Sequence, residues 1–260
     1  MENEQRVKQE VQKQFGANAG KYVTSESHAK GEDLQLLVEW LNPQPHWHCL
    51  DIATGGGHVV KALAPYVRHL LATDLTREML QAAAQHLRQS GCDNVGYVVA
   101  DAESLPFLDD AFDVVTCRIA PHHFPRPDRF IREASRVLRA GGMFLLIDNV
   151  SPEDGELAAF LNTMEKLRDG SHVRCPAVSE WRAWLDEAGL QEKRSRLRKK
   201  TYAFPEWVAR TARSPEQRKQ VEEWILNAPP QTRAYFAVRT EAGKVVSLQV
   251  DEWMILLERR

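Results

Sequence analysis

Short hydrophobic runs alternate with amphipathic segments through the first part of the chain. The runs are apolar at almost every position, which is typical of parallel strands covered by helices on both faces. Between them, hydrophobic residues recur every three or four positions, which predicts helices. Strands are predicted at residues 47–51, 69–74, 95–100, 112–117 and 143–147, and helices at 32–41, 57–64, 77–90 and 127–140. With right-handed crossovers, this alternation predicts a doubly wound α/β fold.

The second half of the chain has a less regular pattern. Helices are predicted at 156–167, 179–188, 205–211 and 215–226, and strand-like segments at 193–201, 235–240, 245–250 and 253–258. Gly243 is expected to turn a hairpin. A chain that ends in hairpins cannot continue the parallel crossover pattern, so at least one antiparallel strand is expected at the edge of the sheet.

The chain begins with a polar segment that carries one apolar stripe. Val7, Val11 and Phe15 lie at spacings of four, which predicts a helix over residues 1–15. A breaker segment follows at residues 16–22. Two interpretations stay open for this region, a frayed terminus and a mobile lid over a site.

Composition indicates an ordinary globular protein. The chain has 260 residues, of which 43% are hydrophobic and 27% charged. A net charge of -2 gives no general reason to expect nucleic acid or an anionic membrane as partner. No apolar stretch approaches the ~20 residues of a membrane helix, and the polar start lacks the apolar core of a signal peptide. The four cysteines are far apart, which predicts reduced thiols in the cytoplasm.

Basic residues alternate along the predicted strand at 193–201. Arg194, Arg196, Arg198 and Lys200 would share one face of it. A nucleic-acid-binding face is one interpretation. An edge strand protected by charge is favoured, because charged edges prevent unwanted strand pairing.

The candidate chemistry is centred on residues 48–57, His-Cys-Leu-Asp-Ile-Ala-Thr-Gly-Gly-Gly. A strand, a glycine turn and a helix bring a ligand against the backbone at a helix N-terminus. Ligands of open α/β sheets bind at the carboxyl ends of the strands. Asp74 ends the second strand, where its carboxylate can accept hydrogen bonds from both hydroxyls of a ribose. It would repel a ribose phosphate, which disfavours a 2′-phosphorylated cofactor.

The glycine spacing distinguishes two classes of nucleotide ligand. The dinucleotide fingerprint Gly-x-Gly-x-x-Gly requires a third glycine, but Val60 stands three residues after Gly57. Asp51 precedes the turn, where it would disfavour a pyrophosphate and suit a positively charged group such as an α-amino group. The pattern therefore favours a mononucleoside that bears a cation.

This set of motifs resembles the class I S-adenosylmethionine-dependent methyltransferases, specifically the small-molecule branch that includes the ubiquinone/menaquinone C-methyltransferases. The first motif of that family, an acid followed by alternating glycines, stands here as Asp51-Ile-Ala-Thr-Gly-Gly-Gly, with Ala53 in place of the first glycine. The segment that begins at Asp101 and the two strands after it also match the family. The resemblance covers about residues 10–150, and four motifs follow in family order.

The resemblance implies a Rossmann-like, mostly parallel, seven-stranded sheet that binds S-adenosyl-L-methionine and releases S-adenosyl-L-homocysteine. It implies that Asp74 binds the ribose, that Leu75 and Met79 contact the adenine, and that Asp101-Ala102 reads its edge. The implied cofactor-binding residues are Tyr22, Asp51, Ala53, Thr54, Gly55, Gly57, Asp74, Leu75, Met79, Asp101, Ala102, Glu103 and Arg118. The implied division is a helical lid segment at 1–30 and a single domain at 31–260, with the cofactor-binding half at 31–150 and the substrate-side additions and last strands at 151–260. No metal is expected, because a sulfonium is already an excellent leaving group.

Two histidines are candidates for catalysis. His122 and His123 follow the fourth strand beside Arg118, where the resemblance places the methyl donor and acceptor. An imidazole there is suited to take a proton from the acceptor, and His122 is preferred; a purely structural role is the alternative. Arg118 is expected to pair with the cofactor carboxylate or an acidic substrate, unless it forms a surface salt bridge.

Substrate recognition is expected in the second half of the chain. Arg168, His172 and Arg174 lie in a polar, glycine-hinged segment and are the candidates to meet an anionic acceptor. Four tryptophans at helical spacing are favoured as core residues over a pocket lining. They are Trp181, Trp184, Trp207 and Trp224.

We therefore expect methyl transfer from S-adenosylmethionine to a small organic acceptor by in-line displacement. Such a reaction needs chiefly positioning and exclusion of water. Two alternatives stay open. A nicotinamide-dependent oxidoreductase is disfavoured by the missing third glycine and by Asp51, whereas a non-catalytic nucleoside-binding regulator would carry the same binding motifs. The accepting atom and the oligomeric state are not predicted.

Overall fold

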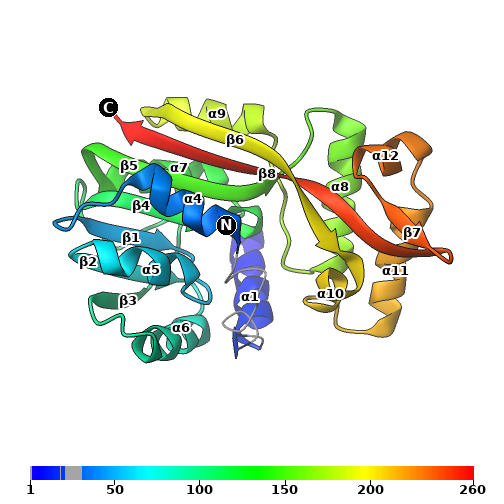
Figure 1. Ribbon diagram of the computed structural model, residues 1–260, viewed down its shortest axis with the longest axis horizontal. Helices are drawn as coiled ribbons and strands as arrows, with labels where there is room; N and C mark the ends of the chain where they lie inside the picture. The colour runs from blue at the N-terminus through cyan, green and yellow to red at the C-terminus, as the bar shows by residue number, and fades with distance from the viewer. Residues whose placement is uncertain (1, 18, 21–30) are drawn as a thin grey trace.

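The computed structural model describes residues 2–17, 19–20 and 31–260, through which one mixed sheet runs (Figure 1). Its strands are β1 (His48–Ile52), β2 (His69–Asp74), β3 (Val95–Val99), β4 (Phe112–Arg118), β5 (Leu138–Val150), β6 (Leu190–Ala203), β7 (Arg239–Glu241) and β8 (Lys244–Arg259). The helices are α1 (Glu2–Gly16), α4 (Glu32–Leu41), α5 (His58–Leu63), α6 (Arg77–Gln89), α7 (Pro127–Val137), α8 (Gly155–Arg168), α9 (Val178–Glu187), α10 (Phe204–Ala209), α11 (Pro215–Leu226) and α12 (Pro230–Tyr235). Two short 3₁₀ turns are η1 (Ala64–Tyr66) and η2 (Pro121–His123).

The strand order is β3-β2-β1-β4-β5-β8-β6, and β7 pairs with β8. Strands β1 to β5 are parallel, whereas β8 runs antiparallel to both β5 and β6. The order reverses between β1 and β4, so the carboxyl ends of these two strands border the crevice where such sheets bind ligands. The predicted doubly wound, mostly parallel sheet is confirmed. It has eight strands and not seven, because the short β7 adds to β8.

Helices cover both faces of the parallel strands. Leu37 of α4, Val60 of α5 and Leu87 of α6 are buried in the core on one face. Phe130 of α7 and Trp181 of α9 are buried in the core on the other face. Each such side chain stabilises the fold by about 1.5–3 kcal/mol relative to an exposed one. Cover on both faces explains why the strands are apolar at almost every position.

The long strands β6 and β8 continue past the parallel strands into a second lobe with α8, α10, α11 and α12 (Figure 1). This lobe has its own hydrophobic core, which includes Leu161, Val221 and Phe236. Helix α1 lies between the lobe and the parallel strands (Figure 1). It contacts both sides, since Gln12 donates to the Leu75 carbonyl at 3.0 Å and Gln14 accepts from Arg213 Nε at 3.1 Å.

Two expectations for the end of the chain are wrong. Residues 245–250 and 253–258 belong to one strand, because Asp251 and Glu252, which interrupt the apolar pattern, pair with Lys199 and Lys200 of β6. Tyr235 ends α12 instead of starting a strand, since proline at position 230 is suited to the first turn of a helix.

The basic strand lies at the edge of the sheet, as predicted, since β6 is the last strand in the order. Three of its four predicted bases, Arg194, Arg198 and Lys200, pair with neighbouring acids. Arg194 lies 3.7 Å from Glu39 of α4, and Arg198 lies 2.5 Å from Glu252 of β8.

Helix α7 also ends earlier than expected. It stops at Val137, and β5 begins at Leu138 and runs through Gly141 and Gly142, which directly follow the predicted helix. Gly141 has φ 72°, and the pairing of β4 with β5 shifts register between Phe112 and Val114. The glycines therefore accommodate a bulge within a strand.

Candidate functional site

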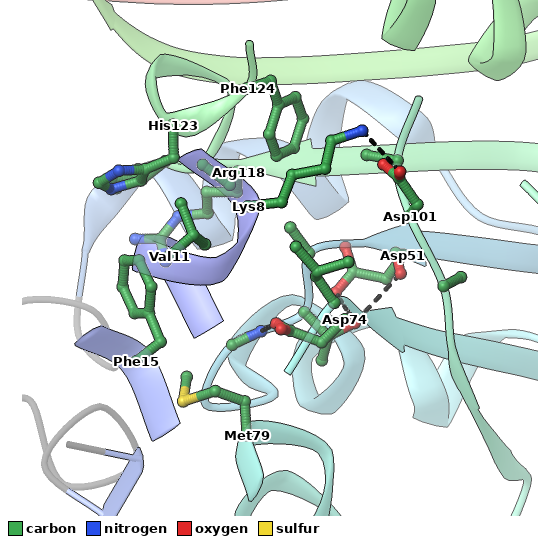
Figure 2. Close-up of a pocket in the computed structure, with 18 of the residues that line it drawn as sticks. Lys8, Val11, Phe15, Asp51, Asp74, Met79, Asp101, Arg118, His123 and Phe124 are labelled. Carbon is green, nitrogen blue, oxygen red and sulfur yellow. Dashed lines mark hydrogen bonds and ion pairs between the residues drawn. The ribbon is translucent and has the colours of Figure 1, made fainter. Parts of the chain in front are cut away.

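A cavity of about 1020 Å³ opens at the carboxyl ends of β1, β2 and β4, and α1 forms part of its wall (Figure 2). We call it the glycine-loop cavity. Sequence-predicted residues that line it are Asp51, Ala53, Thr54, Gly55, Asp74, Leu75, Met79, Asp101, Ala102, Glu103, Arg118 and His123. Predicted residues from three strand ends and the segment that starts at Asp101 therefore meet in one place. Tyr22 lies outside the described residues.

The glycine turn is left-handed at three positions. Ala53, Gly55 and Gly57 have φ 54°, 55° and 83°. An alanine with a left-handed backbone costs roughly 1–2 kcal/mol relative to glycine. Ala53, which stands where the family has a glycine, therefore strains the backbone by about this amount. Gly57 does not line the cavity. A Cβ there would lie 3.1 Å from Leu87 Cδ1, so this glycine lets α6 pack closely against the turn.

Two carboxylates lie at the base of the glycine-loop cavity. Asp51 is buried and accepts hydrogen bonds from Thr116 Oγ1 at 2.6 Å and Thr54 Oγ1 at 2.8 Å. Asp74 accepts from the backbone N–H groups of Gly55 at 3.0 Å and Thr76 at 2.9 Å. Burial raises the pKa of both carboxyls to about 6, against these hydrogen bonds. Buried carboxylates of this kind favour a ligand that supplies a cation or hydroxyl donors.

Asp74 fixes the residue that precedes α6. Thr76 is the N-cap residue of this helix, but its hydroxyl makes no capping hydrogen bond. The Asp74 carboxylate instead accepts from the Thr76 N–H at 2.9 Å. The same side chain thus holds both the glycine turn and the start of α6.

Lys8 was not predicted as a site residue, yet it reaches from α1 to the cavity wall (Figure 2). Its Nζ lies 2.6 Å from both Asp101 Oδ2 and Glu103 Oε2. Burial opposes this charge, but the two carboxylates outweigh it and raise the pKa of Lys8. Val11 and Phe15 also line the cavity. The only sequence signal for Lys8 is its helical spacing from these two residues of the apolar stripe.

Arg118 lines the same cavity, and its side chain is fixed by an acid of α4 that does not line the cavity. Its Nε donates to Asp33 Oδ2 of α4 at 2.5 Å, and both side chains are almost fully buried. Burial opposes the charge of Asp33, but Arg118 outweighs it and lowers the pKa of that carboxyl. A surface salt bridge, the alternative considered for Arg118, is therefore excluded.

The η2 turn places two histidine rings side by side, with centroids 4.2 Å apart. His122 Nδ1 lies 2.7 Å from Asp148 Oδ1, and its backbone N–H donates to Asp148 Oδ2 at 2.9 Å. Burial opposes protonation of His122, but Asp148 outweighs it and raises the pKa of the imidazole. A proton on Nδ1 directed at Asp148 leaves Nε2 as the basic nitrogen of the neutral ring.

His123 and His172 complete this cluster, and the pKa of each is shifted in the opposite direction from that of His122. His123 Nδ1 lies 3.1 Å from the Ser171 carbonyl, and burial together with His122 lowers its pKa to about 4. His172 Nε2 lies 3.1 Å from Asn162 Oδ1, and burial lowers its pKa as well. At neutral pH these two rings are uncharged.

A second cavity of about 610 Å³ lies on the other side of the histidines. We call it the Lys200 cavity. It shares Phe15, Ile119 and His123 with the glycine-loop cavity. The remaining residues that line it are His122, Asn149, Arg168, Asp169, Lys200, Tyr202, Trp207, Arg210 and Thr211.

The three predicted substrate residues lie in different places. Arg168 lines the Lys200 cavity. His172 is buried behind the other two histidines, and Arg174 pairs with Glu180 at the surface at 2.8 Å; neither lines a described cavity of the site. Among the tryptophans, Trp207 is both buried and part of the wall, Trp181 is core, and Trp224 is partly exposed.

Within the described part of the chain, no cluster of three His, Cys, Asp or Glu side chains is arranged to hold a metal ion. The four cysteines are buried and unbridged. No described helix is long and apolar enough to cross a membrane.

Comparisons with known proteins agree with this geometry. A family profile described as "Methyltransferase domain" matches residues 50–146. The chain is 36% identical to the uncharacterized methyltransferase YcgJ of Bacillus subtilis over 224 residues, 86% of this chain and 88% of the relative. A ubiquinone/menaquinone biosynthesis C-methyltransferase UbiE, from Bartonella tribocorum, is 32% identical over 155 residues, 54% of this chain and 60% of the relative. A crystal structure from Bacillus halodurans C-125 superposes with a TM-score of 0.86 at 38% identity, covering 88% of this chain and 99% of that one.

Proposed function

The chain belongs to the methyltransferase family of class I fold, and from that premise we propose that it transfers a methyl group from S-adenosylmethionine to a small organic acceptor. The observation that carries the proposal is the pair of carboxylates, Asp51 and Asp74, around the left-handed glycine turn. Both line the glycine-loop cavity, and burial raises the pKa of each to about 6. A ligand with a cationic amino group and a ribose would satisfy both.

The residues of the glycine-loop cavity fit this cofactor. Asp51 would hold the cationic amino group, Asp74 the ribose hydroxyls, and Arg118 the carboxylate. The adenine would lie between Leu75 and Met79, with its edge against Asp101-Ala102. Thr54 donates a hydrogen bond to Asp51, and Glu103 would form part of the wall beside the adenine. Gly57 would contribute indirectly, by letting α6 pack closely against the glycine turn. Tyr22 stays a prediction.

When bound, S-adenosylmethionine supplies a methyl group on a good leaving group. The chain itself would position the acceptor, exclude water and hold the acceptor's proton. His122 is the proposed base, because Asp148 orients its Nδ1 and leaves Nε2 for the proton. His123 lines both cavities and would separate them as a neutral wall. We also propose a cytoplasmic location, which the free, buried cysteines support.

The site disfavours two alternative functions. A nicotinamide dinucleotide would bring a pyrophosphate against the glycine turn, and a buried carboxylate at Asp51 opposes that. A regulator that only senses the cofactor would share the binding residues but has no use for the His122–Asp148 pair beside a second cavity.

Calorimetry with S-adenosylmethionine, S-adenosylhomocysteine and NAD tests the proposal. We expect the first two ligands to bind and NAD not to bind, and Asp74→Ala to weaken binding at least about tenfold, the loss of one good polar contact. Binding of NAD alone would overturn the proposal. Turnover of a panel of phenols, enols and amines then separates an enzyme from a sensor.

A further inference from the structure

The Lys200 cavity presents cations to its interior while their acidic partners lie behind them. Lys200 Nζ pairs with Glu252, which is almost fully buried in β8 and does not line the cavity. Arg168 has the same arrangement, since its Nη2 lies 2.7 Å from Glu165, a buried acid of α8 that is also outside the lining. Arg210 is a third cation in the wall.

The cation at Arg168 is fixed in position. Its guanidinium lies over the Trp207 ring at 4.3 Å, and Nη1 donates to Thr211 Oγ1 at 3.0 Å. A guanidinium held by a ring on one face and by hydrogen bonds along its edges loses little conformational entropy when it meets a ligand.

One acid, Asp169, is among the described residues that line the Lys200 cavity. Its Oδ1 accepts from the Ser171 N–H at 2.9 Å and from Ser171 Oγ at 2.5 Å, so it is engaged by its own loop. The wall therefore offers three cations against one acid. Because Glu252 and Glu165 lie behind the wall, a ligand's carboxylate would meet the cations first, whereas an apolar ligand would cover charged groups without offering them a hydrogen-bond partner.

Because the cavity meets the glycine-loop cavity at Phe15, Ile119 and His123, a molecule in it would have one end beside the histidines. We propose that the Lys200 cavity is the acceptor site and that the acceptor is a small organic acid. Its carboxylate lies toward Lys200, Arg168 and Arg210, and its methyl-accepting group lies toward His122. This inference rests on the proposed function and adds the substrate class to it.

The experiment uses the full chain saturated with S-adenosylhomocysteine, so that the glycine-loop cavity is filled. Benzoate, 4-hydroxybenzoate and hexanoate are titrated by calorimetry at constant ionic strength, each beside its primary amide. We expect the carboxylates to bind at least about tenfold more tightly than the amides. Lys200→Met should abolish this preference while S-adenosylhomocysteine, supplied at saturating concentration, still binds.

Lys199→Met is the matched control. Lys199 is the adjacent residue of β6 and also pairs with a β8 acid, Asp251 at 2.9 Å, but does not line the cavity. We expect this variant to keep the carboxylate preference within about twofold. If Lys200→Met fails to fold by thermal unfolding, Arg210→Gln replaces it with the same expected loss.

Equal binding of carboxylates and amides, or a preference that both lysine variants lose alike, would overturn the assignment. So would binding of S-adenosylhomocysteine without any binding of the carboxylates. A protein that binds no S-adenosylhomocysteine fails at the earlier step, and that result would count against the proposed function itself.

Discussion

Acidification from about pH 7.5 to about pH 5 should weaken binding of S-adenosylhomocysteine, because the ligand needs the carboxylates of Asp51 and Asp74 ionised. Both groups have a pKa raised to about 6 by burial. If one of them must lose its proton before the ligand binds, the apparent affinity falls about tenfold over this interval. If both must do so, it falls about a hundredfold.

The stability of the ligand-free protein should change in the opposite direction. A carboxyl whose folded pKa lies above its unfolded value favours the folded state most below the unfolded pKa, and that contribution is lost as pH rises through the folded pKa. For Asp51 the window runs from the ordinary carboxyl pKa of 3.8 to the folded pKa of about 6. Its ionisation therefore destabilises the ligand-free protein at neutral pH, on the order of 3 kcal/mol at most. A cationic ligand would offset this destabilisation by pairing with the ionised Asp51 carboxylate.

Calorimetry in two buffers of different ionisation enthalpy measures the number of protons released on binding. Asp51→Asn should remove one titrating group and flatten the pH dependence. Asp113→Asn is the control, because Asp113 is also a buried acid but lies at the other end of β4, where it accepts from the His48 N–H. An affinity that stays constant between the two pH values, with no proton release, would refute the role of both carboxylates.

Three further predictions follow from local geometry. Gly57→Ala should lower the free energy of unfolding, measured by urea titration, by about 1–3 kcal/mol more than Gly91→Ala. Both glycines have positive φ, but only Gly57 lacks room for a Cβ. Equal losses of stability in the two variants would contradict this. Asp148→Asn should shift the acidic limb of the pH–rate profile to lower pH, because Asp148 is the main group that raises the pKa of His122 against burial; an unmoved limb would remove His122 as the base. Lys8→Met should speed dissociation of S-adenosylhomocysteine several-fold in stopped-flow experiments, because α1 loses the two ion pairs that Lys8 makes to the cavity wall. An unchanged dissociation rate would show that α1 does not retain the ligand.

The sequence was sufficient to predict the parts of the site that depend on local order. Asp51 and Asp74 end consecutive strands, and parallel strands bring their carboxyl ends to one edge, so their proximity follows from the alternation of strands and helices. The antiparallel strand was also predictable, from the hairpin at Gly243. The unbroken course of β8 was not, because Asp251 and Glu252 look like an interruption until their partners on β6 are known.

Contacts between distant segments lay beyond the sequence. Lys8 meets Asp101 across 93 positions of the chain, and Arg118 meets Asp33 across 85. Periodicity states which face of α1 or α4 is apolar, but not which strand end that face will meet. Arg174 shows the converse, since a polar loop composition suggested a ligand contact where the structure has a surface ion pair.

The charges of the two cavities are set by one ionic network. Arg118, which lines the glycine-loop cavity, lies 2.5 Å from Asp33, and Asp33 lies 3.8 Å from Arg198. Arg198 in turn shares Glu252 with Lys200, which lines the second cavity. Asp33 and Glu252 are almost fully buried, so removing either would leave cations without a partner in a poorly screened setting. A change at one cavity should therefore alter the charge presented at the other, and donor and acceptor affinities should be measured together in any variant of this network.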